Sequence, residues 1–160
     1  MLGSYMNREE FLKYIDHFNN KRYDEIVKYF APDVVIEYHD NAIYRGGYEV
    51  PPAKTLHGPR EFIENYKKLH EYVDEKLDVG VLMIDEKHIF VELWTEFYCY
   101  RDPPSGSYLQ YKKGDLVVMT NWVLYDLEND KFKRIRIAHF RMHDPKLTKF
   151  FKDKQQNANN

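Results

Sequence analysis

The sequence predicts an α+β fold: a cone-shaped α+β barrel in which three helices from the N-terminal half pack on a curved antiparallel sheet. Three observations predict it. Helical spacing dominates residues 8–73, four β-rich runs follow between residues 75 and 142, and 160 residues suit one domain. Runs of helices followed by runs of strands are typical of helices that cover one face of an antiparallel sheet. A curved sheet closed in this way forms a cone with one open end.

The first helix is predicted to begin after Asn7, a residue suited to the N-cap, because Glu9 and Glu10 follow it in the first turn. Apolar residues then recur at helical spacing, namely Phe11, Tyr14, Ile15 and Phe18. The pattern ends near Asn19.

The second helix is predicted from Tyr23 until Pro32 stops it, because Ile26, Val27 and Phe30 continue the helical spacing. The β-rich segment 34–39 follows as the first strand. Residues 41–52 are rich in Gly and Pro, which indicates a loop that could form a lid.

The third helix is predicted from Pro59 to Val73, because proline suits a first helical turn and apolar residues follow at helical spacing. Four strands are then expected, joined as antiparallel hairpins, at about 75–84, 88–101, 116–127 and 132–142. The whole chain, 1–160, is predicted to be a single domain with an ordered core of about 7–150 and a polar tail at 152–160.

Composition narrows the possible partners. A formal net charge of -2 argues against nucleic acid and anionic membranes, so a small-molecule ligand or substrate is expected. The single Cys99 has no disulfide partner, and we find neither a secretory segment nor a membrane-spanning run, which predicts a cytoplasmic protein. The sequence holds no metal motif, phosphate-binding glycine loop or nucleophile elbow, so no metal and no cofactor are expected.

Strand alternation predicts which side chains face the interior. Tyr38 shares an apolar face with Val34 and Ile36, and His139 shares one with Ile135 and Ile137, together with Lys133 and Arg141. Both faces of the 116–127 run are apolar, so parity alone does not place Asn121. The face bearing Glu92, Trp94, Glu96 and Tyr98 is expected to be the outer sheet surface, where aromatic residues could anchor a homodimer.

The order and spacing of these elements resemble the NTF2-like superfamily, including the SnoaL-like polyketide cyclases, ketosteroid isomerase and scytalone dehydratase. The segments that carry the resemblance are Asn20-Lys21-Arg22-Tyr23-Asp24, Phe30-Ala31-Pro32-Asp33 and the last strand with His139. The resemblance places Tyr14 at the oxyanion tyrosine of ketosteroid isomerase and Asn121 at its protonated aspartate. The catalytic base of that enzyme corresponds to Tyr38 here. Compared with scytalone dehydratase instead, Tyr38 and Asn121 match a water-orienting tyrosine and a pocket asparagine, while Phe18-Asn19 replaces a Tyr-Asp pair.

The resemblance and the alternation together predict a cofactor-independent isomerase, cyclase or dehydratase of a small, apolar, oxygenated metabolite of the polyketide or terpenoid type. His139 would transfer the proton, because imidazole titrates near neutrality, and Tyr14, Tyr38 and Asn121 would polarise a substrate oxygen. The expected wall of the pocket consists of Phe18, Tyr66, Thr95, Phe97 and Met119.

Two of these residues can also be interpreted as structural rather than catalytic. Tyr14 could be a core tyrosine and His139 a core histidine bonded to a carbonyl. The competing function is a non-catalytic NTF2-like module that binds a ligand or a partner protein, because this fold hosts both kinds of protein.

Overall fold

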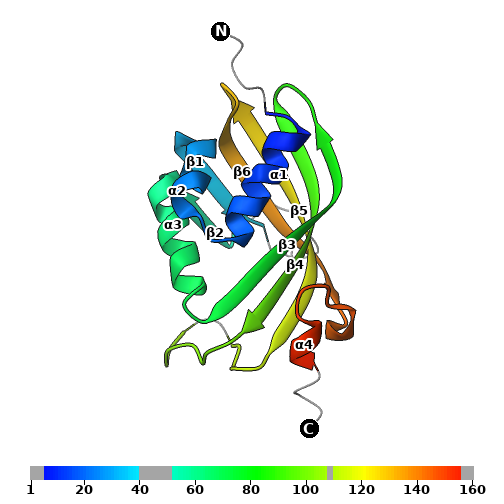
Figure 1. Cartoon of the computed structure of the whole chain (residues 1–160). Helices are drawn as coiled ribbons and strands as arrows, with labels where there is room; N and C mark the ends of the chain where they lie inside the picture. Colours follow the sequence, from blue (N-terminus) through cyan, green and yellow to red (C-terminus); the bar gives the residue numbers. More distant parts are fainter. Residues whose placement is uncertain (1–5, 40–51, 108–109, 156–160) are drawn as a thin grey trace, which may run out of the picture.

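The computed structural model describes residues 6–39, 52–107 and 110–155 (Figure 1). Its elements in chain order are α1 (Arg8–Asn19), α2 (Tyr23–Ile26), the 3-10 turn η1 (Val27–Tyr29), β1 (Phe30–Tyr38), β2 (Lys54–His57), α3 (Gly58–Leu69), β3 (Val73–Ile84), β4 (His88–Cys99), β5 (Leu116–Glu128), β6 (Lys131–His143), the 3-10 turn η2 (Pro145–Leu147) and α4 (Lys152–Gln155). The predicted lid falls at 41–52, and all of it except residue 52 lies outside the described residues.

One six-stranded sheet in the order β2-β1-β6-β5-β4-β3 forms the body of the molecule. Four long strands, β3 to β6, curve around the helices α1 to α3, which lie together on one side of the sheet (Figure 1). The predicted α+β class is therefore confirmed. The sheet is mixed rather than wholly antiparallel, because β1 pairs parallel to β6 while the other neighbours are antiparallel.

The predicted helix starts are confirmed in atomic detail. The side chain of Asn7 caps α1 by accepting a hydrogen bond of 2.9 Å from the backbone N–H of Glu10. Helix α3 has Pro59 in its first turn, and Gly58 before it adopts a φ of 80°, which favours glycine. The last helical turn of α3 ends at Leu69, four residues earlier than predicted.

The expectation that Pro32 ends the second helix was wrong. Helix α2 gives way to η1 at Val27, and β1 already begins at Phe30. Pro32 can lie inside a strand because the β1–β6 register is interrupted between Phe30 and Val35. The missing N–H of proline therefore removes no ladder hydrogen bond.

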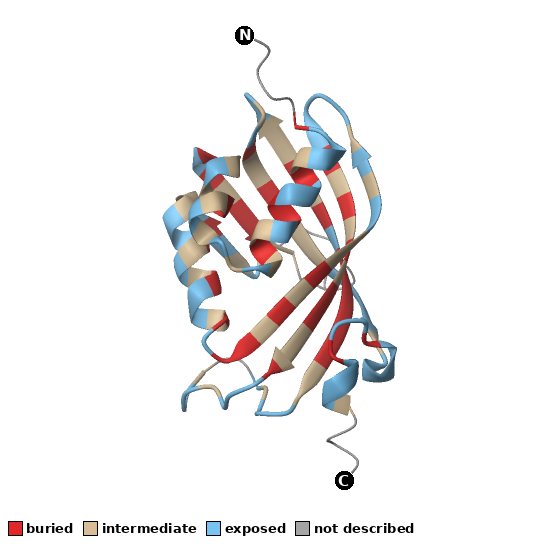
Figure 2. Cartoon of the chain, viewed as in Figure 1, coloured by how far each residue is buried: buried red, intermediate tan, exposed pale blue. Residues whose placement is uncertain are grey.

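The core lies between the helices and the concave face of the sheet (Figure 2). Its centre is aromatic: Phe132 is fully buried, with ring centroids 4.7 Å from Tyr125 and 4.9 Å from Tyr14. Large aromatic side chains stabilise such a core through both buried area and edge-to-face contacts.

Two β-bulges make the inward-facing residues of β6 differ from the predicted ones. The register shifts between Asp126 and Leu127, which turns Phe132 rather than Lys133 into the core. It shifts again between Thr120 and Asn121, which pairs Asn121 with His139 but pairs Arg141 with the outward-facing Thr120. A bulge inserts one residue and reverses the parity beyond it, which simple alternation cannot foresee.

The outer face of β4 is covered by the C-terminal segment, residues 145–155, which contains η2 and α4. The carboxylate of Glu96 is fully buried beneath it and accepts hydrogen bonds from the Thr148 hydroxyl, from the backbone N–H of Lys149 at 2.7 Å and from Trp94 Nε1 at 2.5 Å. Phe151 is buried and lies 5.6 Å from the ring of Tyr98. Trp94 and Tyr98, the aromatic residues expected on the free outer surface, are thus packed against the chain's own C-terminal segment.

Candidate functional site

Polar side chains from β1, β3, β4, β5, β6 and α3 face the concave side of the sheet. We call them the polar belt. Each strand member shares its parity with core residues such as Leu77, Val91 or Val123, so the belt lies on the same face as the core. The belt consists of Tyr38, Tyr66, His70, Glu75, Thr95, Asn121 and His139.

Asn121 and Thr95 occupy neighbouring positions on β5 and β4. The amide Nδ2 of Asn121 donates to Thr95 Oγ1 at 3.1 Å, and both residues are more than nine-tenths buried. Among the described residues, Asn121 Oδ1 has no hydrogen-bond partner. An unpaired buried amide group costs about 1–3 kcal/mol, so this site is built at the expense of stability.

Tyr38 and Tyr66 form a hydroxyl pair between β1 and α3, with 2.6 Å between their oxygens. Phe18 of α1 packs edge-on against Tyr66 with ring centroids 5.3 Å apart. Burial raises the pKa of Tyr66 well above its ordinary value, and the nearby Tyr38 and Glu75 raise it further. Tyr66 therefore remains a neutral phenol at physiological pH and can act as a hydrogen-bond donor.

A second polar group extends from the end of α3 to β3. His70 Nε2 lies 2.9 Å from Glu75 Oε1, and His70 Nδ1 lies 2.6 Å from the hydroxyl of Tyr23. His70 and Glu75 are both buried, whereas Tyr23 is half-buried. Burial raises the pKa of Tyr23 to about 12, assisted by Glu75 and Tyr100.

Sequence reasoning missed His70 and Glu75. The signal was present for Glu75, since a carboxylate stands between Val73 and Leu77 on an alternating apolar face. The prediction extended α3 to Val73 and began the strand at Glu75, so this alternation was not visible. His70 follows Tyr66 by one helical turn, which was a further cue.

Tyr14 is part of the hydrophobic core. Burial raises the pKa of its hydroxyl well above the ordinary value, and the nearby Tyr125, Tyr38 and Glu75 add to the effect. Its ring packs against Phe132 in the aromatic core. The structure thus places Tyr14 in the core, where its ring contacts Tyr125 and Phe132.

The other predicted residues divide between the interior and the rim. Met119 is buried on the same face of β5 as Asn121. Phe97 is half-buried and lies 6.4 Å from the ring of Tyr111. His139 stands directly across from Asn121 on β6, and its side chain is exposed at the rim.

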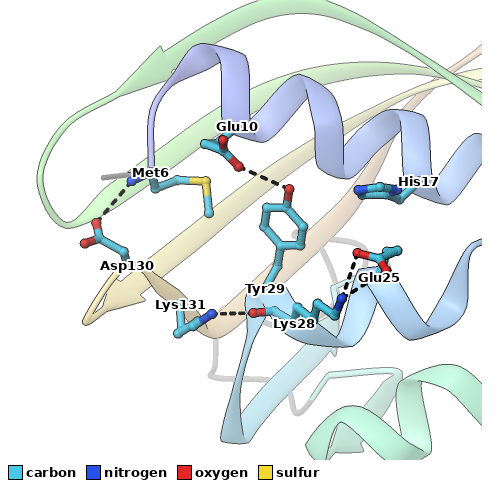
Figure 3. A pocket seen from close by; sticks show the side chains of 8 residues that line it. All are labelled: Met6, Glu10, His17, Glu25, Lys28, Tyr29, Asp130 and Lys131. Carbon is cyan, nitrogen blue, oxygen red and sulfur yellow. Dashed lines mark hydrogen bonds and ion pairs between the residues drawn. The ribbon is translucent and has the colours of Figure 1, made fainter. Parts of the chain in front are cut away.

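A surface depression of about 220 Å³ lies apart from the belt, between α1, η1 and the β5–β6 turn (Figure 3). The polar groups that line it already bond to one another or to the backbone: Lys28 to Glu25, Tyr29 to Glu10, and Asp130 to the N–H of Met6. None of the predicted site residues reaches it. Its lining consists of Met6, Glu10, His17, Glu25, Lys28, Tyr29, Asp130 and Lys131.

The described part of the chain contains no group of three or more His, Cys, Asp or Glu side chains placed to hold a metal ion. Within the same residues, no helix has the length and apolar character needed to cross a membrane.

Comparison with known proteins identifies the fold. No protein family model and no curated protein matches the sequence. Among solved structures, a proposed polyketide cyclase from Xanthomonas campestris pv. campestris has a TM-score of 0.63 at 15% identity, and the match covers 79% of this chain and 84% of that protein. An NTF2-like protein of unknown function from Cytophaga hutchinsonii has a TM-score of 0.55 at 12% identity, and the match covers 91% of this chain and 96% of that one. The chain has the NTF2-like fold.

The NTF2-like fold is shared by proteins of different activity. An LEH-like epoxide hydrolase from M. tuberculosis has a TM-score of 0.56 at 11% identity, with 79% of this chain and 77% of that chain covered. Cyclase, hydrolase and proteins of unknown function thus use one architecture. The activity of this chain has to be argued from its own polar belt.

Proposed function

We propose that the chain is a cofactor-independent isomerase, cyclase or dehydratase that acts on a small, apolar, oxygenated metabolite. The observation that supports it most directly is the buried, unpaired amide oxygen of Asn121 on the concave face. Buried polar groups in proteins nearly always have partners, so a ligand oxygen is the natural partner for this one. The surrounding aliphatic and aromatic residues suit a ligand that is otherwise apolar.

Asn121 would hold a ligand oxygen in either orientation of its amide. As placed, Oδ1 accepts a hydrogen bond from a substrate hydroxyl or enol. Rotated by half a turn, the amide accepts the Thr95 hydroxyl proton and directs its N–H groups at a substrate carbonyl. Both orientations leave one amide group for an oxygen-bearing ligand.

His139 and the pair of Tyr38 and Tyr66 complete the proposed chemistry. The hydroxyls of the tyrosine pair are joined by a hydrogen bond, and such neutral phenols can stabilise negative charge that develops on a substrate oxygen. His139, opposite Asn121 at the rim, would carry a proton between the substrate and solvent. Tyr14 would support the site from the aromatic core, where its ring packs against Phe132.

The competing function is a binding protein that uses the belt to retain a ligand without converting it. To separate the two, we would incubate the protein with a panel of small cyclic ketones, polyketides and terpenoid alcohols and analyse the mixture by mass spectrometry. His139→Ala is the test variant, and His88→Ala, an exposed histidine beside Asp85, is its matched control. An isomer or dehydrated product made by wild type and the control but not by His139→Ala supports the enzyme. A compound retained unchanged by all three identifies a binder.

A homodimer through the outer sheet face also remains part of the proposal, as does a cytoplasmic location. With Trp94 and Tyr98 covered, the exposed aromatic residues of this face are Trp122 and Phe140, whose rings stack at 3.8 Å. We expect Trp122→Glu to convert a dimer into a monomer without unfolding it, as measured by analytical ultracentrifugation. If wild type sediments as a monomer at every concentration tested, the dimer proposal is wrong.

A further inference from the structure

Two buried groups on the concave face take no part in the proposed roles of Asn121 and His139. They are Glu75 on β3 and His70 at the end of α3, which lie 2.9 Å apart and are joined to Tyr23 of α2. A buried carboxylate is costly unless hydrogen bonds hold it. Its position on the wall that would face the substrate therefore requires an explanation.

We infer the positions of the protons from these hydrogen bonds. The Tyr23 hydroxyl, whose pKa is raised to about 12, keeps its proton and can donate it to His70 Nδ1. In that arrangement the Nε2–H group of His70 donates to Glu75 Oε1. The backbone carbonyl of His70 also accepts a hydrogen bond of 2.5 Å from the Tyr100 hydroxyl, which fixes the end of α3.

One carboxylate oxygen of Glu75 remains available. His70 uses Oε1, and no described residue hydrogen-bonds to Oε2. Glu75 of β3 pairs with Phe97 of β4. Thr95 lies two residues from Phe97 on the same face of β4. Such diagonal neighbours are about 7–8 Å apart, which is a suitable spacing for one small substrate to reach both Glu75 and the amide of Asn121 bonded to Thr95.

We propose that Glu75 is the general base of the polar belt, with His70 and Tyr23 as its positioning residues. This inference rests on the proposed function, and it assigns the proton-abstracting group to β3, whereas His139 lies on β6. The substrate class that fits is a carbon acid, a compound whose C–H is activated by an adjacent carbonyl held at Asn121.

The reaction balances without a further reactant. Glu75 Oε2 takes the proton from the substrate carbon, and the electron pair of that C–H bond forms the enolate. The proton then returns to a different carbon, which gives an isomer, or His139 protonates a hydroxyl that departs as water, which gives a dehydrated product. Nothing is oxidised or reduced.

A probe that needs no knowledge of the natural substrate tests this base. Nitrobenzisoxazole is a flat, apolar carbon acid: a base removes its ring C–H proton, that electron pair forms a nitrile, the N–O bond breaks, and a coloured phenolate leaves. We expect wild type to accelerate this ring opening, and Glu75→Gln to lower kcat by about 100-fold, the lower end of the usual range for general-base catalysis. Glu71→Gln, an exposed carboxylate one residue from His70, is the matched control and should keep the wild-type rate.

Glu75→Gln retains an oxygen that can accept the His70 hydrogen bond, so it should fold, and circular dichroism verifies this. Glu75→Asp keeps the charge on a shorter side chain and should have an intermediate rate. Equal rates for wild type and Glu75→Gln, or no acceleration by wild type, would overturn the assignment of Glu75.

The positioning roles of His70 and Tyr23 have their own readout. His70→Gln can still donate an N–H to Glu75 whereas His70→Leu cannot, so we expect Gln to preserve part of kcat that Leu loses, with KM for the probe unchanged. The ¹⁵N spectrum of the His70 ring should show a proton on Nε2 in wild type and a mixture of tautomers in Tyr23→Phe. Identical kcat in His70→Gln and His70→Leu would show that His70 only supports the fold.

The two proposals can fail separately. If metabolite conversion depends on His139 but Glu75→Gln retains it, the enzyme proposal stands and the base assignment is wrong. If nitrobenzisoxazole opening depends on Glu75 while no metabolite is converted, Glu75 is an accessible base and the enzyme proposal is wrong.

Discussion

Two buried glutamates on adjacent strands show how differently the two faces of the sheet use the same side chain. Glu96 on the outer face of β4 accepts hydrogen bonds from Trp94, Thr148 and the backbone of the C-terminal segment. Glu75 on the inner face of β3 is bonded through one oxygen only, to His70. Both are more than nine-tenths buried.

The difference lies in how completely each carboxylate is satisfied. Both carboxylate oxygens of Glu96 accept hydrogen bonds from protein donors. These hydrogen bonds hold residues 148–150 against the sheet. Glu75 and Asn121 each leave an oxygen without a partner among the described residues. Stability favours saturated groups, whereas binding and catalysis need groups kept ready for a ligand.

The largest loss of stability is expected from removal of the Glu96 carboxylate, because both of its oxygens accept hydrogen bonds. Glu96→Ala should lower the free energy of unfolding by about 3–5 kcal/mol, because it leaves several buried donors without an acceptor. Urea unfolding at neutral pH measures it. Glu92→Gln, which disturbs the solvent-exposed hydrogen bond from Trp122 Nε1, should cost less than about 1 kcal/mol. A smaller loss for Glu96→Ala than for Glu75→Gln would contradict the comparison.

On the inner face, substitution of the polar groups is expected to preserve or raise the stability of the protein rather than lower it. Replacing both partners, as in Asn121→Leu with Thr95→Val, should leave the unliganded protein equally stable or more stable by about 1 kcal/mol, because an unpaired buried amide disappears. Ligand binding should be lost. The outer-face control is Thr120→Val, whose hydroxyl bonds to His143 Nε2 at 2.7 Å, and it should lose about 1 kcal/mol. Thermal unfolding of the three proteins gives the ranking.

The smallest effect on stability is expected for Glu37, whose carboxylate also has hydrogen-bond partners but is less deeply buried than that of Glu96. Glu37 of β1 forms a paired contact with the Arg134 guanidinium, whose hydrogen bonds and charge hold the Glu37 pKa below its ordinary 4.5. Since the folded pKa is the lower one, this stabilisation is complete above pH 4.5 and is lost as pH falls through the folded value.

Glu37→Gln should therefore cost about 0.5–1 kcal/mol at neutral pH and almost nothing at the acid end of that window. Urea unfolding repeated between neutral and acid pH measures the change. An unchanged difference between the two proteins across that range would mean that the Arg134 contact does not stabilise the fold.

The sequence predicted those parts of the fold that depend on local patterns. The cap at Asn7, the proline at the start of α3 and the hairpins formed by β3 to β6 each have a signature within a few residues. Pro32 inside β1 and the two bulges of β6 depend on which strands become neighbours, and periodicity holds no such information.

Tyr38 and Asn121 of the candidate site were predicted, each from alternation or from the resemblance. Alternation placed Tyr38 on the concave face and the resemblance placed Asn121 there, and the structure shows both on that face. The bond between His70 and Glu75 joins a helix end to the following strand and required the true end of α3. The hydrogen bond from the Thr148 hydroxyl to Glu96 joins segments 52 residues apart, which no local sequence pattern could reveal.

The parallel pairing of β1 with β6 has a consequence for how the chain is made. A ribosome delivers β1 well before β6, so the antiparallel pair of β1 and β2 must wait for β6 before it joins the rest of the sheet. Until then, the edge of β1 that later contacts β6 is open to strands of other chains. Such long-range pairing slows folding, and we expect nascent chains that stop before residue 131 to require chaperones.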